Sequence, residues 1–297
     1  MKPSGVNLNP AEEFPIIWNT KALRQKTTQI SKGNSGLLMM TVNGLVISER
    51  IIGENDKYIS VLTAEYGTID VFVNGGNKIT GKNQSATQLF SYSKLCMTCR
   101  KERFYLNSSE LIYDFFNLRL DIRKLTLACY FGEVIRYSVL AHNIIYENGK
   151  LSDTEIMRLT LNCLYMLSEN KRSCEFIKSV FEMRFLCEIG LRPQLIGCKV
   201  CYAYENEDFF FLINQSYVLC EYHFEENGLD ENDYNIRITP SQFAALQFIC
   251  FTDMERLFNF RVSPESQAKL NEVTEKYILA NMSRSFRSLE YYKTLLP

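Results

Sequence analysis

The sequence lacks most of the features that membrane insertion and catalysis require. Its 297 residues contain no apolar run of about 18 residues, the length that spans a bilayer. The first residues, MKPSGVNLNPAEEFP, lack the basic-then-apolar order of a signal peptide. The sequence has only two histidines, and no Walker A, G-x-S-x-G or dinucleotide-binding glycine motif. We therefore expect a cytoplasmic protein that is not an enzyme.

An excess of charge of one sign is also absent, because the net charge is −1. The charge is nevertheless uneven. Residues 1–36 carry five basic and two acidic side chains, residues 37–113 carry eight and seven, and residues 114–297 carry 20 and 25. Any nucleic-acid surface is therefore expected in the first hundred residues. The composition, 46% hydrophobic and 23% charged, is typical of folded domains.

The hydrophobic pattern divides the chain into four regions. Residues 1–39 show no sustained periodicity, which indicates a tail or extension that is partly ordered at best. Residues 40–113 contain about five short runs rich in Val, Ile, Thr, Tyr and Phe, separated by turn signals, which is the size of an OB-fold β-barrel. Residues 114–196 and 236–297 have helical spacing, and residues 197–235 form a cysteine-rich insertion. The predicted fold class is therefore α+β and multidomain: a barrel, then an all-α domain with an inserted zinc-ribbon-like segment.

The insertion contains a C-x2-C-x18-C-x2-H pattern, formed by Cys198, Cys201, Cys220 and His223. Two such pairs supply the four ligands of a tetrahedral zinc ion, and the gap between them is typical of zinc ribbons. The segment EDFFFLINQSYVL between the pairs is predicted to form two short strands around Asn214. Four protein ligands leave no position for an activated water, so we expect one structural Zn²⁺.

The alternative for this pattern is a set of core cysteines with a surface histidine. It is weaker, because Cys and His together occupy only 12 of 297 positions. The second C-x2-C, Cys96 and Cys99, lies in strand pattern and is interpreted as unreactive strand cysteines. His142, near the end of a helical run, is assigned a capping or packing role. Ten cysteines without an export signal indicate a reducing compartment.

The order of these parts resembles the RecO family of bacterial recombination mediators, from Met40 to about Leu295. Four stretches carry the resemblance, in the family's order: ENDKYISVLTAEYGTIDVFVNGGNK, FYLNSSELIYDFFNLRLDIRKLTLACYFGEVI, FEMRFLCEIGLRPQLIGCKVC and FRSLEYYKTL. Three features depart from the family pattern. Tyr202 and His223 replace a Gly and a Cys of the zinc segment, the loop after the third strand keeps only Lys78 and Lys82, and residues 1–39 extend beyond the family.

The resemblance implies a nucleoid-associated protein of DNA repair and recombination. It implies binding of single- and double-stranded DNA, annealing of complementary strands, and loading of the RecA recombinase together with RecR. It also implies binding of the acidic C-terminal tail of the single-strand-binding protein.

Basic residues of the barrel region are the candidate contacts to phosphate. They are Arg50, Lys57, Lys78, Lys82, Lys94, Arg100, Lys101 and Arg103, with Arg100–Arg103 at a predicted hairpin tip. Four aromatic residues are candidates for base stacking, with barrel core as the alternative for each: Tyr58, Tyr66, Phe72 and Phe104. The tail of the single-strand-binding protein requires an apolar groove beside a cation, and Arg119, Arg123 and Arg136 are the candidates for that cation.

Two other functions fit the sequence. One is a zinc-stabilised protein-interaction scaffold with little direct DNA binding, which the thin positive charge of the barrel would favour. The other is a metal-dependent hydrolase, for which the sequence offers no open metal position. Reversing the charge of Lys78 and Lys82 distinguishes the scaffold from a DNA-binding protein. The change should weaken DNA binding by a DNA-binding protein and have no effect on a scaffold.

Overall fold

The computed structural model describes residues 29–32, 38–78, 81–140, 153–226 and 234–296. The chain divides into two compact units. One contains the N-terminal sheet and the following helices up to Glu169, together with the last helix. The other spans Asn170–Ser285. The sequence had suggested a different division, in which all helices form one domain. His142 lies outside the described residues.

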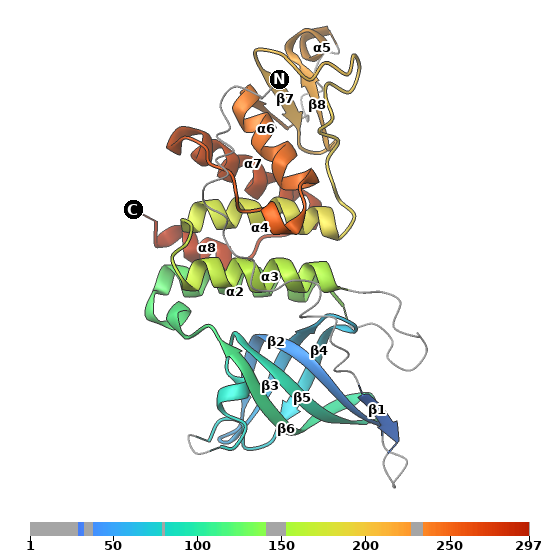
Figure 1. The fold of residues 1–297 in the computed structure, drawn as a ribbon, viewed down its shortest axis with the longest axis vertical. Helices are drawn as coiled ribbons and strands as arrows, with labels where there is room; N and C mark the ends of the chain where they lie inside the picture. Colours follow the sequence, from blue (N-terminus) through green and yellow to red (C-terminus); the bar gives the residue numbers. More distant parts are fainter. Residues whose placement is uncertain (1–28, 33–37, 79–80, 141–152, 227–233, 297) are drawn as a thin grey trace. The chain divides into compact units, whose positions relative to one another are not determined.

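The N-terminal unit begins with an antiparallel-rich sheet (Figure 1). Its strands are β1 (Gln29–Lys32), β2 (Leu38–Ile52), β3 (Asp56–Thr63), β4 (Gly67–Val73), β5 (Ser91–Arg100) and β6 (Arg103–Asp114). The five strands from β2 to β6 match the number predicted between residues 40 and 113. β1 pairs with β2 from within the region that the sequence assigned to a tail.

The strand pairings form a closed cycle. They run β2–β3–β4–β6–β5 and return to β2, which pairs with both β3 and β5. The register of β2 against β3 shifts between Val46 and Ser48. Such a bulge bends a long strand and increases its twist, which lets β2 reach two neighbours. Gly44 permits the close approach of β3, because a Cβ at this position would lie 2.2 Å from Cγ1 of Val61.

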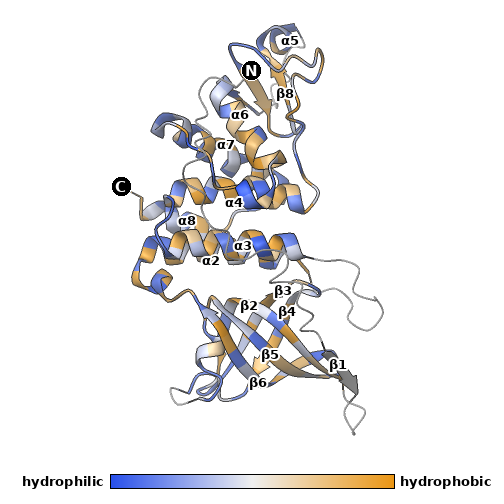
Figure 2. Ribbon diagram, in the orientation of Figure 1, coloured by the Kyte–Doolittle hydropathy of each residue, from blue (hydrophilic) through white to orange (hydrophobic). Residues whose placement is uncertain are grey.

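Alternation along the strands fills the interior of the cycle with apolar side chains, and Figure 2 shows hydrophobic and hydrophilic residues mixed along them. The buried cluster consists of Met40, Val42, Val46, Ile59, Val61, Tyr66, Ile69, Val71, Val73, Leu95 and Met97, with Phe104 and Leu106 packed against it. Tyr66 and Phe104 are therefore core residues, the alternative that the sequence had left open for them.

Within the part of this unit that the structure describes, three α-helices follow the sheet: α2 (Ile122–Ser138), α3 (Thr154–Ser168) and α8 (Arg287–Thr294). The short 3-10 helices are η1 (Ser85–Thr87) and η2 (Phe116–Leu120). α2 packs closely on β2, because a Cβ on Gly132 would lie 2.6 Å from the carbonyl oxygen of Ile47. The Glu133 carboxylate on α2 accepts hydrogen bonds from the backbone amides of Arg287 and Ser288. It thereby satisfies amides at the first turn of α8 that have no partner within that helix.

The second unit contains α4 (Cys174–Glu188), β7 (Phe209–Leu212), β8 (Tyr217–Cys220), α5 (Glu221–Glu226), β9 (Asn235–Ile238), α6 (Pro240–Phe251), η3 (Met254–Arg256) and α7 (Pro264–Met282). α4 ends at Glu188, and Gly190 follows with a φ of +90°, which glycine adopts without strain. α6 opens with the capping box of Thr239 and Gln242. α7 ends at Met282, and a separate short helix, α8, follows it in the sequence.

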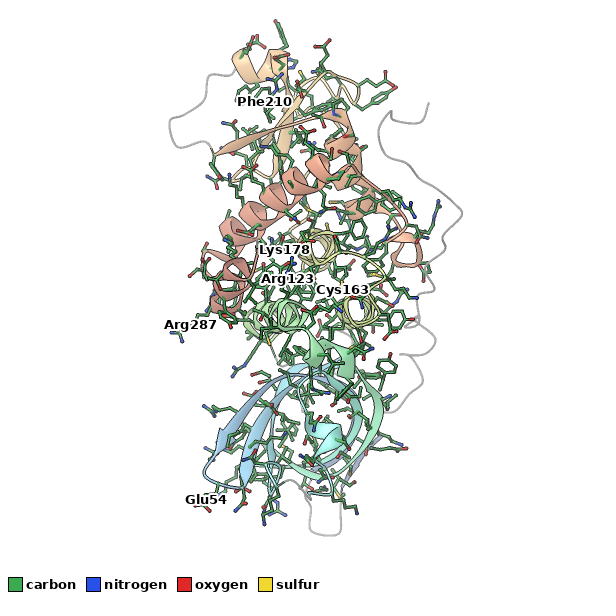
Figure 3. All side chains as sticks on the ribbon, turned by 90° about the vertical axis from the view of Figure 1, so that its left-hand side faces the viewer. Glu54, Arg123, Cys163, Lys178, Phe210 and Arg287 are labelled. Atoms are coloured by element: carbon green, nitrogen blue, oxygen red, sulfur yellow. The ribbon has the colours of Figure 1, made fainter. Side chains whose placement is uncertain are left out.

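A buried polar network joins α4 to α7. The Lys178 ammonium lies 2.9 Å from carboxylate oxygens of both Glu182 and Glu275. The hydroxyl of Thr274 donates to Glu182 at 2.7 Å. Lys178 is labelled in Figure 3. Burial raises the pKa of Glu182, and the neighbouring ammonium and hydroxyl counteract that increase. Because both buried charges have partners, this network fixes how the two helices pack.

Candidate functional site

The four predicted metal ligands come together in the second unit. Cys198 and Cys201 lie on a turn before β7, Cys220 ends β8, and α5 carries His223. β7 and β8 pair antiparallel, with Phe209 opposite Cys220, as the predicted two strands require. β9 adds a third strand beside β7, which the sequence did not indicate. We call residues 197–226 the metal knuckle. Phe210, labelled in Figure 3, marks its strand β7.

The ligand atoms of the metal knuckle converge within 4.8 Å of one another. Sγ of Cys198 lies 3.7 Å from Nδ1 of His223, and Sγ of Cys201 lies 3.9 Å from Sγ of Cys220. Nε2 of His223 is 3.9 Å from a carboxylate oxygen of Glu226, the outer partner that metal-bound imidazoles usually have. Among the described residues this is the one group of Cys, His, Asp and Glu that is arranged to bind a metal ion.

The surroundings act differently on two thiols of the cluster, since burial raises the pKa of Cys220 whereas the pKa of Cys198 is lowered. Burial raises the pKa of the Cys198 thiol, but hydrogen bonds from the backbone of Cys201, Cys220 and Val200 outweigh it and lower that pKa to about 6. Cys198 and Cys220 are buried, whereas Cys201 is exposed. Thiolate is the form that coordinates a metal, so the backbone around Cys198 favours the metal-binding form of that thiol.

A second arrangement lies on the outer face of the N-terminal sheet. Val71 and Val73 point into the core, so Phe72 between them points outward, and the same alternation turns Tyr105 away from Phe104 and Leu106. The ring of Phe72 lies 5.2 Å from that of Tyr58 and 5.8 Å from that of Tyr105. Three half-exposed rings therefore form one row across β3, β4 and β6.

An arginine lies at each end of this row. The guanidinium of Arg50 lies 5.6 Å from the ring of Tyr58, and that of Arg100 lies 6.0 Å from the ring of Tyr105. We call these five residues the aromatic row. Tyr58 and Phe72 were candidates from the sequence, but Tyr105 was not. The feature that identifies Tyr105 is its position directly opposite Phe72 in the pairing of β4 with β6. The sequence does not reveal this position, because the pairing joins residues far apart in the chain.

Seven of the eight candidate phosphate contacts are exposed: Arg50, Lys78, Lys82, Lys94, Arg100, Lys101 and Arg103. Arg100 and Arg103 pair across the predicted hairpin tip, and Lys101 and Glu102 both have positive φ, as a type I′ turn requires. Lys57 differs, because it is only 4% exposed and its ammonium pairs with Glu49 at 3.0 Å. Its charge is directed to Glu49 rather than to solvent.

The three candidate arginines for partner binding lie apart. The Arg119 guanidinium is held by both carboxylate oxygens of Asp114 and by the carbonyl of Leu89. Arg123 is half-buried in the first turn of α2, and Arg136 is exposed in its last turn. The helical rise places these two about 20 Å apart. The three residues therefore do not form one compact groove.

An apolar cavity with cations at its wall occurs in the second unit instead. It has a volume of about 490 Å³ and is lined by residues that include Arg172, Phe176, Phe260, Arg261, Gln267 and Asn271. The rings of Phe176 and Phe260 lie 4.7 Å apart, and the guanidinium of Arg172 lies 4.9 Å from the Phe176 ring. Two adjacent apolar rings and two guanidinium groups thus meet at one cavity, as a site for an acidic tail with apolar residues requires.

Comparison with known proteins identifies the family. Residues 38–115 match the model of the recombination protein O N-terminal region, and residues 119–290 match that of its C-terminal region. The chain belongs to the RecO family. It is 28% identical over 256 residues to the DNA repair protein RecO of Acetivibrio thermocellus, which covers 86% of this chain and 97% of that relative.

Two further RecO relatives extend the similarity. The DNA repair protein RecO of Alkaliphilus metalliredigens is 24% identical over 259 residues, covering 87% of this chain and the whole relative. That of Bacillus subtilis is 24% identical over 240 residues, covering 81% and 88%. The chain is therefore a DNA repair protein of the RecO family. Within the residues that the structure describes, no helix has the length and apolar character needed to cross a membrane.

Proposed function

We propose that this RecO-family protein binds single- and double-stranded DNA on the outer face of its N-terminal sheet, which we interpret as an OB-fold barrel. The cyclic pairing of five strands supports this interpretation, because OB-folds are small five-stranded barrels that bind oligonucleotides on one face. The aromatic row is the observation that carries the proposal. Proteins that bind single strands combine stacking rings with cations for the phosphates, and the row contains both.

The chemistry of the row suits strand annealing. Rings stack on any base, and arginines contact phosphate without reading sequence, so a strand is held while its bases stay free to find their complement. Only a few cations lie near the row, so binding of DNA would release only a few counterions. We propose that the protein anneals complementary strands in this way and, with RecR, helps to load RecA, without catalysing a reaction itself. Such a protein acts at the nucleoid in the cytoplasm.

The ion of the metal knuckle is proposed to be a structural zinc. Zinc–sulfur bonds of 2.3 Å in a tetrahedron separate two sulfur ligands by about 3.8 Å. The Cys201–Cys220 distance of 3.9 Å agrees with this value. Three thiolates and one imidazole fill four positions, so the ion would hold the β7–β8 turn against α5 and would have no open position for a reacting water.

For the acidic tail of the single-strand-binding protein we propose the cavity between α4 and the start of α7. Its rings accept apolar side chains, and Arg172 and Arg261 lie at its wall for carboxylates. Fluorescence anisotropy tests this site with a labelled acidic peptide that has apolar residues at its C-terminal end. The binding of this peptide is compared between the wild type and the variant Arg172→Ala/Arg261→Ala. Loss of binding is expected. Arg136→Ala, which removes an exposed cation from α2, is expected to change nothing.

Annealing of two labelled complementary oligonucleotides tests the DNA function. We expect the wild type to anneal at low salt and to lose activity as salt rises. The variant Arg50→Glu/Arg100→Glu reverses both ends of the aromatic row and should abolish annealing. The matched control, Arg136→Glu/Arg287→Glu, makes the same charge change at exposed positions of α2 and α8. Equal losses in both variants would contradict binding at the row, and a wild type that neither binds nor anneals would leave only the scaffold function.

A further inference from the structure

The metal knuckle exposes three tyrosines that are close in sequence to its candidate ligands. Tyr202, Tyr204 and Tyr222 are 66%, 69% and 68% exposed. Tyr202 directly follows the ligand Cys201, and Tyr222 lies between Cys220 and His223, with its ring 5.0 Å from that of His223. Because the sulfurs of Cys201 and Cys220 are 3.9 Å apart, the cluster holds the backbones that carry these rings close together. None of the three rings contributes to the core of the knuckle, which lies elsewhere.

Tyr202 has an unfavourable backbone conformation. Its φ of +60° is in the left-handed region, where a Cβ is disfavoured and glycine is not. The turn requires this conformation, because the amide of Tyr202 donates to the carbonyl of Cys198 and the amide of Cys198 donates to the carbonyl of Ala203. An exposed ring gains little burial to offset the strain. A strained, exposed side chain of this kind indicates a role outside the fold.

The charge around these rings is strongly negative. Between Cys198 and Glu226 the chain carries six carboxylates, at Glu205, Glu207, Asp208, Glu221, Glu225 and Glu226, and a single cation, Lys199. The ammonium of Lys199 donates to the side chain of Gln194, and Asp208 pairs with Arg237 of β9. Glu205, Glu207, Glu225 and Glu226 are exposed. Such a surface repels phosphate and attracts cations.

We propose that the metal knuckle is a docking surface for an arginine- and lysine-rich segment of a partner protein. Tyrosine faces accept guanidinium and ammonium groups through cation–π contacts, and the surrounding glutamates pair with the same groups. The charge complementarity selects this partner over a nucleic acid. The surface lies apart in sequence from the aromatic row, and the inference does not depend on DNA binding by the sheet.

The test measures the binding of a short fluorescein-labelled peptide of alternating arginine and serine to the zinc-loaded full chain by anisotropy. Tyr202→Ser/Tyr204→Ser/Tyr222→Ser should weaken binding about tenfold, the product of three modest cation–π contacts. Glu205→Gln/Glu207→Gln/Glu225→Gln should weaken it and reduce its salt dependence. The absorption spectrum of the cobalt-substituted protein must stay unchanged in each variant, which shows that the knuckle still folds.

Matched controls separate docking from the general acidity of the chain. Tyr291→Ser removes an exposed tyrosine of α8, and Glu54→Gln/Glu110→Gln/Glu265→Gln removes three exposed glutamates elsewhere. Both controls should bind as the wild type does. Equal weakening in controls and knuckle variants would overturn the proposal. So would a loss of oligonucleotide binding in the knuckle variants, which would indicate DNA as the partner, or a change in their mass by light scattering, which would indicate a second copy of the chain.

Discussion

The outer face of the N-terminal sheet and the metal knuckle both expose aromatic side chains, but the charges beside the rings have opposite signs. In the sheet, Arg50 and Arg100 lie against the rings at the ends of the row. In the knuckle, the chain segment that carries Tyr202, Tyr204 and Tyr222 has six carboxylates and one lysine, and Arg237 of β9 pairs with one of the carboxylates. Aromatic rings stack on bases and also accept cations, so the rings alone do not select a partner. The flanking charges differ, which is why we propose DNA as the partner of the sheet and a basic protein segment as the partner of the knuckle.

The two surfaces also differ in what holds them in place. The aromatic row lies on a sheet whose buried core contains about a dozen apolar side chains, nearly all of them from the five strands β2 to β6. The core of the knuckle is small, with Cys198, Leu212, Leu219 and Cys220 at its centre. Two of these four residues belong to the group that could hold a metal ion. We therefore expect the knuckle to depend on the proposed ion for its stability, as small domains with insufficient cores generally do.

Removal of the metal is expected to have the largest effect and to affect only one of the two surfaces. Cys220→Ala removes a proposed ligand at the end of β8, directly before α5 begins. The expected loss is large because structural zinc contributes about 10 kcal/mol to the stability of small zinc domains. We expect loss of bound zinc and rapid proteolysis within residues 197–226. Oligonucleotide binding by the sheet should change less than about twofold, a difference below 0.5 kcal/mol. If a chelator leaves the proteolysis of the knuckle unchanged, the cluster does not hold a structural ion.

Loss of the rings in the row should have the next largest effect and should affect the opposite surface. Tyr58→Ala/Tyr105→Ala removes two stacking positions, each of which contributes about 1–3 kcal/mol per base. We expect Kd for a single-stranded oligonucleotide to rise roughly a hundredfold. The half-exposed rings lie outside the buried core, so thermal unfolding should shift little. The measurement is anisotropy with labelled oligo-dT.

The control for this prediction is Tyr137→Ala/Tyr291→Ala, which removes two exposed tyrosines from α2 and α8. It should leave the affinity for the oligonucleotide unchanged. If the Tyr58/Tyr105 variant also binds as the wild type does, the row is not a stacking platform, and the basic hairpin tip would have to account for DNA binding.

A third prediction concerns Lys57, which is buried, whereas the other candidate phosphate contacts are exposed. We expect its charge to contribute to the stability of the fold and not to DNA binding. Its stem packs on Gly76, where a Cβ would lie 2.9 Å from Cγ of Lys57, and its ammonium pairs with Glu49. Lys57→Ala should therefore lower the free energy of unfolding by about 1–2 kcal/mol through lost packing and the unpaired Glu49. Chemical denaturation measures this loss, and the salt dependence of DNA binding should stay that of the wild type. A shallower salt dependence would restore Lys57 as a phosphate contact.

Local patterns in the sequence predicted much of the knuckle, because its chemistry is local. The spacing of Cys198, Cys201, Cys220 and His223 specifies a ligand set, and the strands on either side of Asn214 bring its halves together. β9 was missed because the polar–apolar alternation of Asn235–Ile238 extends over only four residues, too few to indicate a strand without its pairing to β7.

The aromatic row could be predicted only in part, because it depends on long-range register. In the sequence Phe104 and Tyr105 are adjacent aromatic residues, and nothing local decides which of them faces the core. The parallel pairing of β4 with β6 decides it, by placing Tyr105 opposite Phe72. The burial of Lys57 has the same origin, since its partner Glu49 lies eight residues away on the neighbouring strand. The division into units also depends on contacts between residues far apart in the sequence. α8 belongs to the unit of the sheet, although the whole of Asn170–Ser285 separates it from that unit in the sequence.

The smallest expected effect tests whether the strain at Tyr202 serves binding. Tyr202→Gly removes a Cβ from a left-handed backbone and should stabilise the knuckle by about 1 kcal/mol, measured as slower proteolysis or a higher denaturation midpoint of the zinc-loaded protein. The same substitution should weaken binding of the arginine-rich peptide, because it removes one of three rings. A residue kept for the fold would show the reverse, with lower stability and unchanged binding. Opposite signs for stability and affinity would therefore show that Tyr202 is retained at the expense of the fold for contact with a partner.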